Sequence, residues 1–99
     1  MTEPFIVRPE AEHDIAQAFD WYETKKPGLG IEFIMAVDDA FTAIQQLPLA
    51  FAIVHREVRR ALLRKFPYGI YYVAGEKGIS VIACFHAKRA PSGWKRRLR

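Results

Sequence analysis

The sequence predicts an α+β domain with the element order β-α-α-β-β-β, in which a helical hairpin packs on one face of a small, mainly antiparallel sheet. Apolar residues recur at helical spacing in the first half of the chain and at strand spacing in the second half. The length and composition also indicate a single domain, because 99 residues with 51% hydrophobic and 26% charged side chains are typical of one compact domain.

The N-terminal part predicts a short strand followed by a helix. Phe5 to Val7 is an apolar run, and Pro9 excludes a continuing central strand while fitting the first turn of a helix. From there, apolar residues recur at helical spacing, at Ala11, Ile15, Phe19 and Tyr22. Pro27 and Gly28 are typical of the end of a helix, so we expect it to stop just before them.

A second helix follows this short link. Its apolar residues recur at intervals of four, four and three, at Phe33, Val37, Phe41 and Ile44. Leu47 and Pro48 end it, because proline cannot continue a helix. The short link leaves room only for an antiparallel return, so we expect a helical hairpin with both apolar stripes turned the same way.

The second half predicts three strands after an irregular stretch at residues 48–55. Branched and aromatic residues become common there, and the expected strands are residues 58–64, 69–73 and 79–85. The turn at 75–78 is too short for a parallel crossover, so the last two strands pair antiparallel. Such a sheet buries one face against the helix pair, and its other face is left to solvent.

The two halves of the chain carry opposite charge. Residues 1–54 hold three basic and nine acidic side chains, whereas residues 55–99 hold twelve basic and two acidic ones. The formal net charge of +4 therefore conceals a strongly positive C-terminal half. A local positive field of this kind attracts anionic partners.

The candidate binding residues are ten side chains of this basic half. Strand 58–64 is basic on both faces, which indicates either a binding surface or a solvated face with one buried ion pair. Trp94 interrupts the basic tail, and it either anchors the tail on the fold or stacks on a base of the ligand. The full set is Arg59, Arg60, Arg64, Lys65, Lys88, Arg89, Trp94, Lys95, Arg96 and Arg97.

His86 is the candidate for proton transfer. It stands at the end of the last strand beside the basic tail, and a histidine gains or loses a proton near neutral pH. The alternative is a histidine whose ring is bonded to a backbone carbonyl. Cys84 is expected to pack rather than react, because no second functional group is placed beside it. The histidines and the cysteine have no ligand spacing, so we expect neither a metal site nor a cofactor.

Several function classes are excluded by composition. No apolar run approaches the ~18–20 residues of a bilayer span, and the first residues lack the pattern of a signal peptide. The single cysteine excludes an internal disulfide. We therefore expect a cytoplasmic protein with no membrane partner and no small-molecule substrate.

The order and spacing of several segments are similar to those of a known family. The segments are Arg8 to Ala11 with Asp14 and Ile15, Trp21 to Glu23, Pro27 to Gly30 with Phe33, Arg59, Phe66 to Tyr68, Ile70 to Tyr72, His86 to Pro91, and Trp94 to Arg97. In the order and spacing of these segments the chain resembles the RelE/ParE superfamily of toxins from bacterial type II toxin–antitoxin systems. The resemblance covers nearly the whole chain and implies a single toxin domain, residues 1–99, with a basic C-terminal tail, residues 88–99.

The resemblance implies a growth-inhibiting toxin of the kind linked with plasmid stabilisation, held inactive by a cognate antitoxin. ParE-like members poison DNA gyrase, whereas RelE-like members cut mRNA in the ribosomal A site. Gly69 stands where RelE-like nucleases often have a basic residue. The sequence has no tyrosine after Tyr72, so the catalytic tyrosine near the C-terminus of those nucleases has no counterpart here. These departures favour the ParE-like branch.

Three functional hypotheses follow in order. The first is a ParE-like gyrase poison that acts by binding. The alternative is a RelE-like, ribosome-dependent mRNA endonuclease that works without a metal, for which the catalytic residues would be His86, Arg60 and Arg89, with Lys65 and Lys95 as further phosphate contacts. The second alternative is a non-catalytic nucleic-acid-binding module, for which the basic half alone would suffice.

Overall fold

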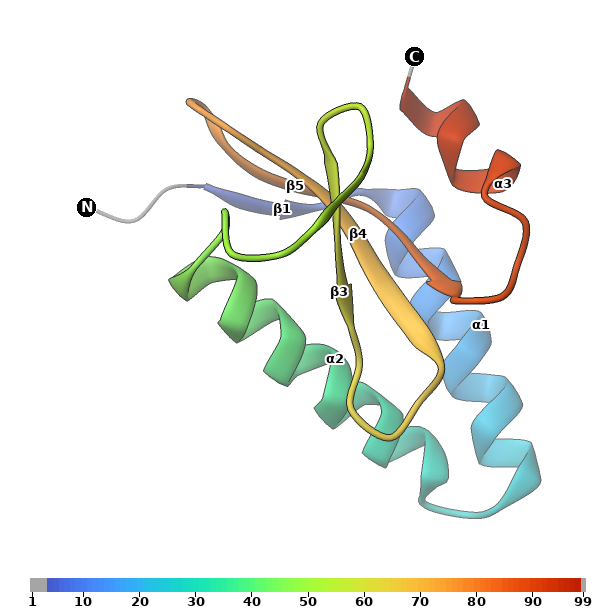
Figure 1. Ribbon diagram of the computed structural model, residues 1–99. Coiled ribbons are helices and arrows are strands. Elements are labelled where there is room, and N and C mark those ends of the chain that lie inside the picture. Colours follow the sequence, from blue (N-terminus) through green and yellow to red (C-terminus); the bar gives the residue numbers. More distant parts are fainter. Residues whose placement is uncertain (1–3, 99) are drawn as a thin grey trace.

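The computed structural model describes residues 4–98, so the last residue of the expected basic tail lies outside the described part. Its sheet has five strands in the order β1-β5-β4-β3-β2, and two long helices pack against it (Figure 1). The strands are β1 (Phe5–Val7), β2 (Ile53–His55), β3 (Val58–Leu62), β4 (Tyr68–Gly75) and β5 (Gly78–His86). The helices are α1 (Pro9–Lys25), α2 (Leu29–Gln46) and α3 (Ser92–Lys95), with a short 3-10 turn η1 (Arg96–Leu98).

The expected fold class is confirmed. Strands β2 to β5 pair antiparallel and only β1 runs parallel to its neighbour β5, so the sheet is mainly antiparallel. The α1–α2 hairpin joins at Gly28, whose φ of 91° is a left-handed conformation that glycine adopts without strain. Glu23 accepts hydrogen bonds from the backbone N–H groups of Gly28 and Gly30, both at 2.9 Å. Its carboxylate thereby caps the first turn of α2 from the preceding helix.

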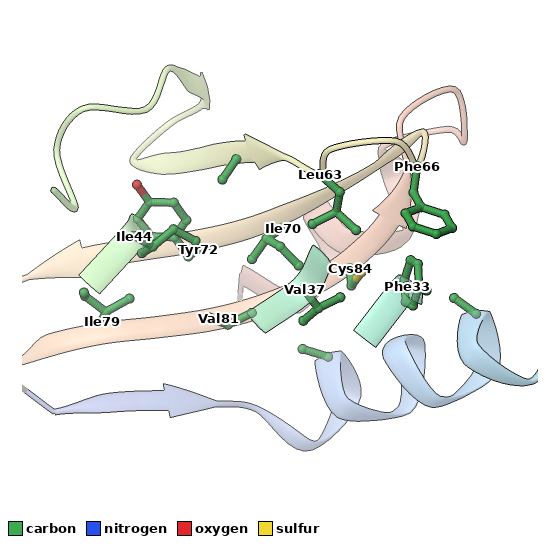
Figure 2. Packing of buried hydrophobic residues seen from close by; sticks show 13 residues of the cluster. Phe33, Val37, Ile44, Leu63, Phe66, Ile70, Tyr72, Ile79, Val81 and Cys84 are labelled. Atoms are coloured by element: carbon green, nitrogen blue, oxygen red, sulfur yellow. The ribbon is translucent and has the colours of Figure 1, made fainter. Parts of the chain in front are cut away.

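The main core lies between the helix pair and the sheet. Figure 2 shows Ile44 of α2 beside Tyr72 of β4 at one end of this core and Phe33 of α2 beside Phe66 at the other. Burial of this apolar area is the principal source of stability, at about 25 cal/mol per Å². Cys84 belongs to the same cluster and is buried, in agreement with its expected packing role.

A second, smaller core covers the opposite face of the sheet. Trp94 of α3 is 3% exposed and stacks on Tyr71, with the ring centroids 4.6 Å apart at 26°. The same cluster contains Val58, Ile82 and Phe85, and Leu98 packs against it. The expectation of a solvated second face is therefore wrong for this part of the sheet, because the C-terminal segment covers it.

Two local expectations differ from the structure. The strand expected over residues 58–64 ends at Leu62, since Leu63 N–H bonds to Tyr68 O and Lys65 adopts a left-handed φ of 71° in the turn that follows. The stretch expected to be irregular contains the edge strand β2, which pairs with β3 through only two residue pairs. Both differences arise from tertiary pairing, which overrides local preference.

We predict that Trp94→Ala lowers the free energy of unfolding by about 3–5 kcal/mol, the usual cost of emptying a buried aromatic site. Urea denaturation followed by circular dichroism measures it. Leu62→Ala is the control, because Leu62 is 57% exposed, and its effect should stay within about 0.5 kcal/mol. Equal effects of the two changes would mean that α3 adds nothing to the fold.

Candidate functional site

Arg97, one of the candidate binding residues, is engaged within the molecule. Its guanidinium donates to both carboxylate oxygens of Asp14, at 2.7 and 3.1 Å, and to the carbonyl of Ile82 at 2.9 Å. Asp14 is buried and also accepts the backbone N–H of Cys84 at 3.0 Å. The hydrogen bonds and negative charge of Asp14 raise the pKa of Arg97. This cation therefore serves the fold rather than an external anion.

The position of this ion pair follows from the sheet. Strand β1 pairs with β5 only as far as Val81, and the β4–β5 register shifts just beyond that residue. The edge of β5 after Val81 has no neighbouring strand, and buried backbone groups need partners. Asp14 of α1 and Arg97 of η1 supply them to Cys84 and Ile82.

Arg59 is likewise engaged. Its guanidinium donates to the carbonyl oxygens of Leu49 and Phe51, at 3.2 and 2.7 Å, and so holds the loop that follows α2. Arg59 and Arg97 thus bind their own chain. Sequence alone left open which basic residues would do so.

Three other cations converge on one pocket. Arg60 of β3, Arg89 and Lys95 line a pocket of about 200 Å³ together with Tyr71 and Trp94. We call this the cationic pocket. Within residues 4–98, none of these three side chains has a hydrogen bond or ion pair to another residue of the chain. Their charges are therefore available to an external anion.

Two local features place these cations. A Cβ atom at Gly69 would lie 2.9 Å from Cγ of Arg60, so the bare glycine makes room for the arginine stem. The guanidinium of Arg89 lies over the ring of Phe85, 4.2 Å from its centroid. A cation–π contact of this kind orients the arginine without neutralising it.

His55 borders this region and carries little positive charge of its own. Its ring lies edge-on to Trp94 at 5.9 Å. Desolvation, followed by the positive charges of Lys95 and Arg56, lowers the pKa of His55. The neutral ring therefore predominates at pH 7, and the field of the cationic pocket comes from arginine and lysine.

His86 and Arg60 line different pockets. His86 lines a separate cleft between α1 and the end of β5, and its ring packs on Tyr68 with the centroids 5.4 Å apart. Its Nδ1 accepts the backbone N–H of Lys88 at 3.1 Å. Arg89 lines both the cleft and the cationic pocket. The three residues expected of a nuclease are thus divided between two sites, with Arg89 between them.

The remaining candidate residues lie elsewhere. Arg64 and Lys65 line a hollow of about 390 Å³ beside Glu32 and Asp39 of α2. Lys88 and Arg96 are exposed, and Arg96 Nε donates to the carbonyl of Ser92 at 3.3 Å. Within the described residues, no three histidine, cysteine, aspartate or glutamate side chains gather to hold a metal ion.

Sequence reasoning missed the buried carboxylate and one wall of the cationic pocket. Asp14 falls at helical spacing between Ala11 and Ala18, both buried. A carboxylate on the apolar stripe of a helix is the available signal, since buried charges are paired. Tyr71 gave no such signal, because its partner Trp94 follows 23 positions later.

No family model matches this chain, and no curated protein matches it in sequence. A solved structure does match in fold: a chain described as "Chromosomal ParDE TA system from P. aeruginosa" aligns with a TM-score of 0.76. The alignment covers 86% of this chain and 96% of that chain at 16% sequence identity. The chain has a ParE/RelE-like fold. The resemblance seen in the sequence is thereby confirmed at the level of the fold. In the described part of the chain, no helix is both long and apolar enough to cross a membrane.

We predict that Asp14→Asn lowers the free energy of unfolding by about 2–3 kcal/mol, less than the full cost of breaking a buried pair, because the Arg97 side chain is 21% exposed. Chemical denaturation measures this loss. Glu12→Gln removes a charge from the same helix at an exposed position and should be nearly neutral. An Asp14→Asn protein as stable as the parent would show that the β5 edge needs no carboxylate.

Cys84 should be unreactive in the folded protein. Burial, together with the charge of Asp14, raises the pKa of its thiol to about 12, so the nucleophilic thiolate is scarce at pH 8. We expect iodoacetamide to leave the native protein unmodified at pH 8 and to alkylate it fully in denaturant. Mass spectrometry distinguishes the two, and rapid alkylation of the native protein would contradict this environment.

Proposed function

We propose that this protein is the toxin of a type II toxin–antitoxin system, that it acts in the cytoplasm by binding DNA gyrase, and that a cognate antitoxin neutralises it. Its fold is similar to that of a chain from a ParDE TA system. The observation that carries the binding mode is the convergence of Arg60, Arg89 and Lys95 in the cationic pocket. Three unpaired cations, from β3, the bend after β5 and α3, suit recognition of an anionic macromolecular surface.

The separation of His86 from Arg60 supports binding over cleavage. A metal-free nuclease needs a proton-transfer group and charge-stabilising cations on the same phosphate. Arg60 lines the cationic pocket and His86 lines the cleft beside α1, so only Arg89 is shared between the two sites. The ribosome-dependent mRNA endonuclease remains the alternative.

The antitoxin proposal rests on charge and exposed apolar surface. Val54 lines the cationic pocket and is 37% exposed. A segment that covers the pocket would combine acidic with apolar side chains. Salt screens the attraction between the acidic side chains of that segment and the cations of the pocket. The affinity of the toxin–antitoxin complex should therefore fall as the ionic strength rises. Affinity that is independent of salt would contradict this mode of neutralisation.

Inducible expression in bacterial cells tests the toxin activity. We expect growth arrest with gyrase-dependent DNA breaks, because a gyrase poison traps the cleaved DNA. Arg60→Gln and Arg89→Gln should each weaken the arrest, and the double variant should abolish it. Lys77→Gln is the matched control, since Lys77 lies in the exposed β4–β5 turn and should leave the arrest intact.

The same cells distinguish the alternatives. Cleavage of mRNA on translating ribosomes that is lost in His86→Ala would select the endonuclease and overturn the gyrase proposal. Normal growth with nucleic-acid binding would select the non-catalytic module and overturn the toxin. Co-expression of the product of a small adjacent reading frame should restore growth if that product is the antitoxin.

A further inference from the structure

An aromatic cleft lies on the helix side of the molecule and shares only Arg89 with the cationic pocket. It has a volume of about 520 Å³ and opens between α1 and the end of β5. That volume falls within the roughly 300–1,000 Å³ typical of small-molecule sites. We call it the aromatic cleft. Its residues are Asp14, Gln17, Ala18, Trp21, Tyr22, Pro67, Tyr68, Cys84, His86 and Arg89.

The helix supplies one wall of the aromatic cleft through its spacing. Positions 14, 17, 18, 21 and 22 recur at three- and four-residue intervals and so share one face of α1. Ala18 is small and leaves room between the larger residues of this face. The opposite wall comes from β4 and β5, at the edge that β1 does not reach.

Four rings line the cleft in a continuous series. Trp21 meets Tyr22 edge-on at 5.0 Å, Tyr22 meets Tyr68 at 6.0 Å, and Tyr68 meets His86 at 5.4 Å. Trp21 is 54% exposed, which is unusual for a side chain that normally buries its ring. Nζ of Lys25 lies over the Trp21 ring, 4.8 Å from its centroid, so a planar ligand would stack on the part of the ring that Lys25 leaves exposed.

The polar groups of the cleft suit a ligand with hydrogen-bonding edges and negative charge. Burial raises the pKa of Tyr22 and of Tyr68, so both phenols stay protonated and can donate as well as accept. Asp14 adds no free negative charge, because Arg97 and Cys84 occupy its oxygens. Arg89 leaves the cleft with an unpaired positive charge.

We propose that the aromatic cleft binds a nucleotide, with the base stacked on the exposed ring of Trp21 and the phosphate held by Arg89. The combination selects this class of ligand: an aliphatic metabolite would need no ring series, and a purely anionic ligand would need no stacking surface. The nucleotide is either a free nucleoside monophosphate or an unpaired residue of a single strand, since both present the same base and phosphate.

Isothermal titration calorimetry with the full chain tests the proposal. The probes are the four nucleoside 5′-monophosphates, the matching nucleosides, ribose 5-phosphate, inorganic phosphate and a short single-stranded oligonucleotide. We expect a monophosphate to bind more tightly than its nucleoside and than ribose 5-phosphate, because each of these lacks one of the two contacts. Tighter binding of the oligonucleotide than of the monophosphate would identify the single strand as the source.

Two variants locate the site. Trp21→Ala should lower the affinity for the monophosphate by about 5- to 100-fold, the loss expected for one stacking ring. Arg89→Gln should lower the affinity for the monophosphate but leave that for the nucleoside unchanged. Leu62→Ala and Lys77→Gln are the matched controls, since they remove an exposed apolar residue and an exposed charge outside the cleft.

Three results would overturn the proposal. They are no binding of any monophosphate at millimolar concentration, inorganic phosphate binding as tightly as the nucleotide, and affinity unchanged by Trp21→Ala. Because Trp21 is exposed, its replacement should leave the fold intact, and a circular dichroism spectrum checks this. Growth arrest plays no part in the measurement, so the nucleotide proposal and the toxin proposal fail independently.

Discussion

The unpaired edge of β5 is the constraint on which the rest of the structure depends. Strand β1 stops at Val7, and each buried backbone group left without a partner costs about 1–3 kcal/mol. Asp14 and Arg97 pair this edge from two segments separated by 83 positions in the chain. The Asp14–Arg97 ion pair thus satisfies the backbone groups at the sheet edge, and it joins both α1 and the C-terminal segment to β5.

That segment in turn determines which cations are free. With η1 held by Asp14, Trp94 of α3 lies on Tyr71, and Lys95 reaches the pocket that Arg60 and Arg89 also line. The basic residues of the C-terminal half therefore fall into two groups. Arg59 and Arg97 bind their own chain, whereas the residues of the cationic pocket can bind an external anion, and the net charge does not distinguish the two groups.

Local signals in the sequence sufficed for the helices but not for the site. Pro9 and Gly28 mark helix boundaries through backbone chemistry that acts within one turn, so α1 and α2 begin and end close to the expected residues. Strand β2 was missed because only its pairing with β3 makes it a strand. The availability of a cation is also nonlocal. Arg97 and Lys95 lie two positions apart, yet Arg97 is paired with Asp14 whereas Lys95 lines the cationic pocket. The stripe containing Phe19 and Tyr22 predicted a helix correctly but could not reveal the opposite wall of the cleft.

The close approach of Arg60 to Gly69 links two positions on neighbouring strands. The space above residue 69 holds either a side chain of its own or the stem of the arginine, because a Cβ there would lie 2.9 Å from Cγ of Arg60. Proteins that share this fold should consequently covary at the two positions, with a long residue at one accompanied by a small residue at the other. A change that moves the positive charge from position 60 on β3 to position 69 on β4 would therefore pass through a protein with small residues at both positions. The arginine at position 60 has to be replaced before a long side chain can appear at position 69.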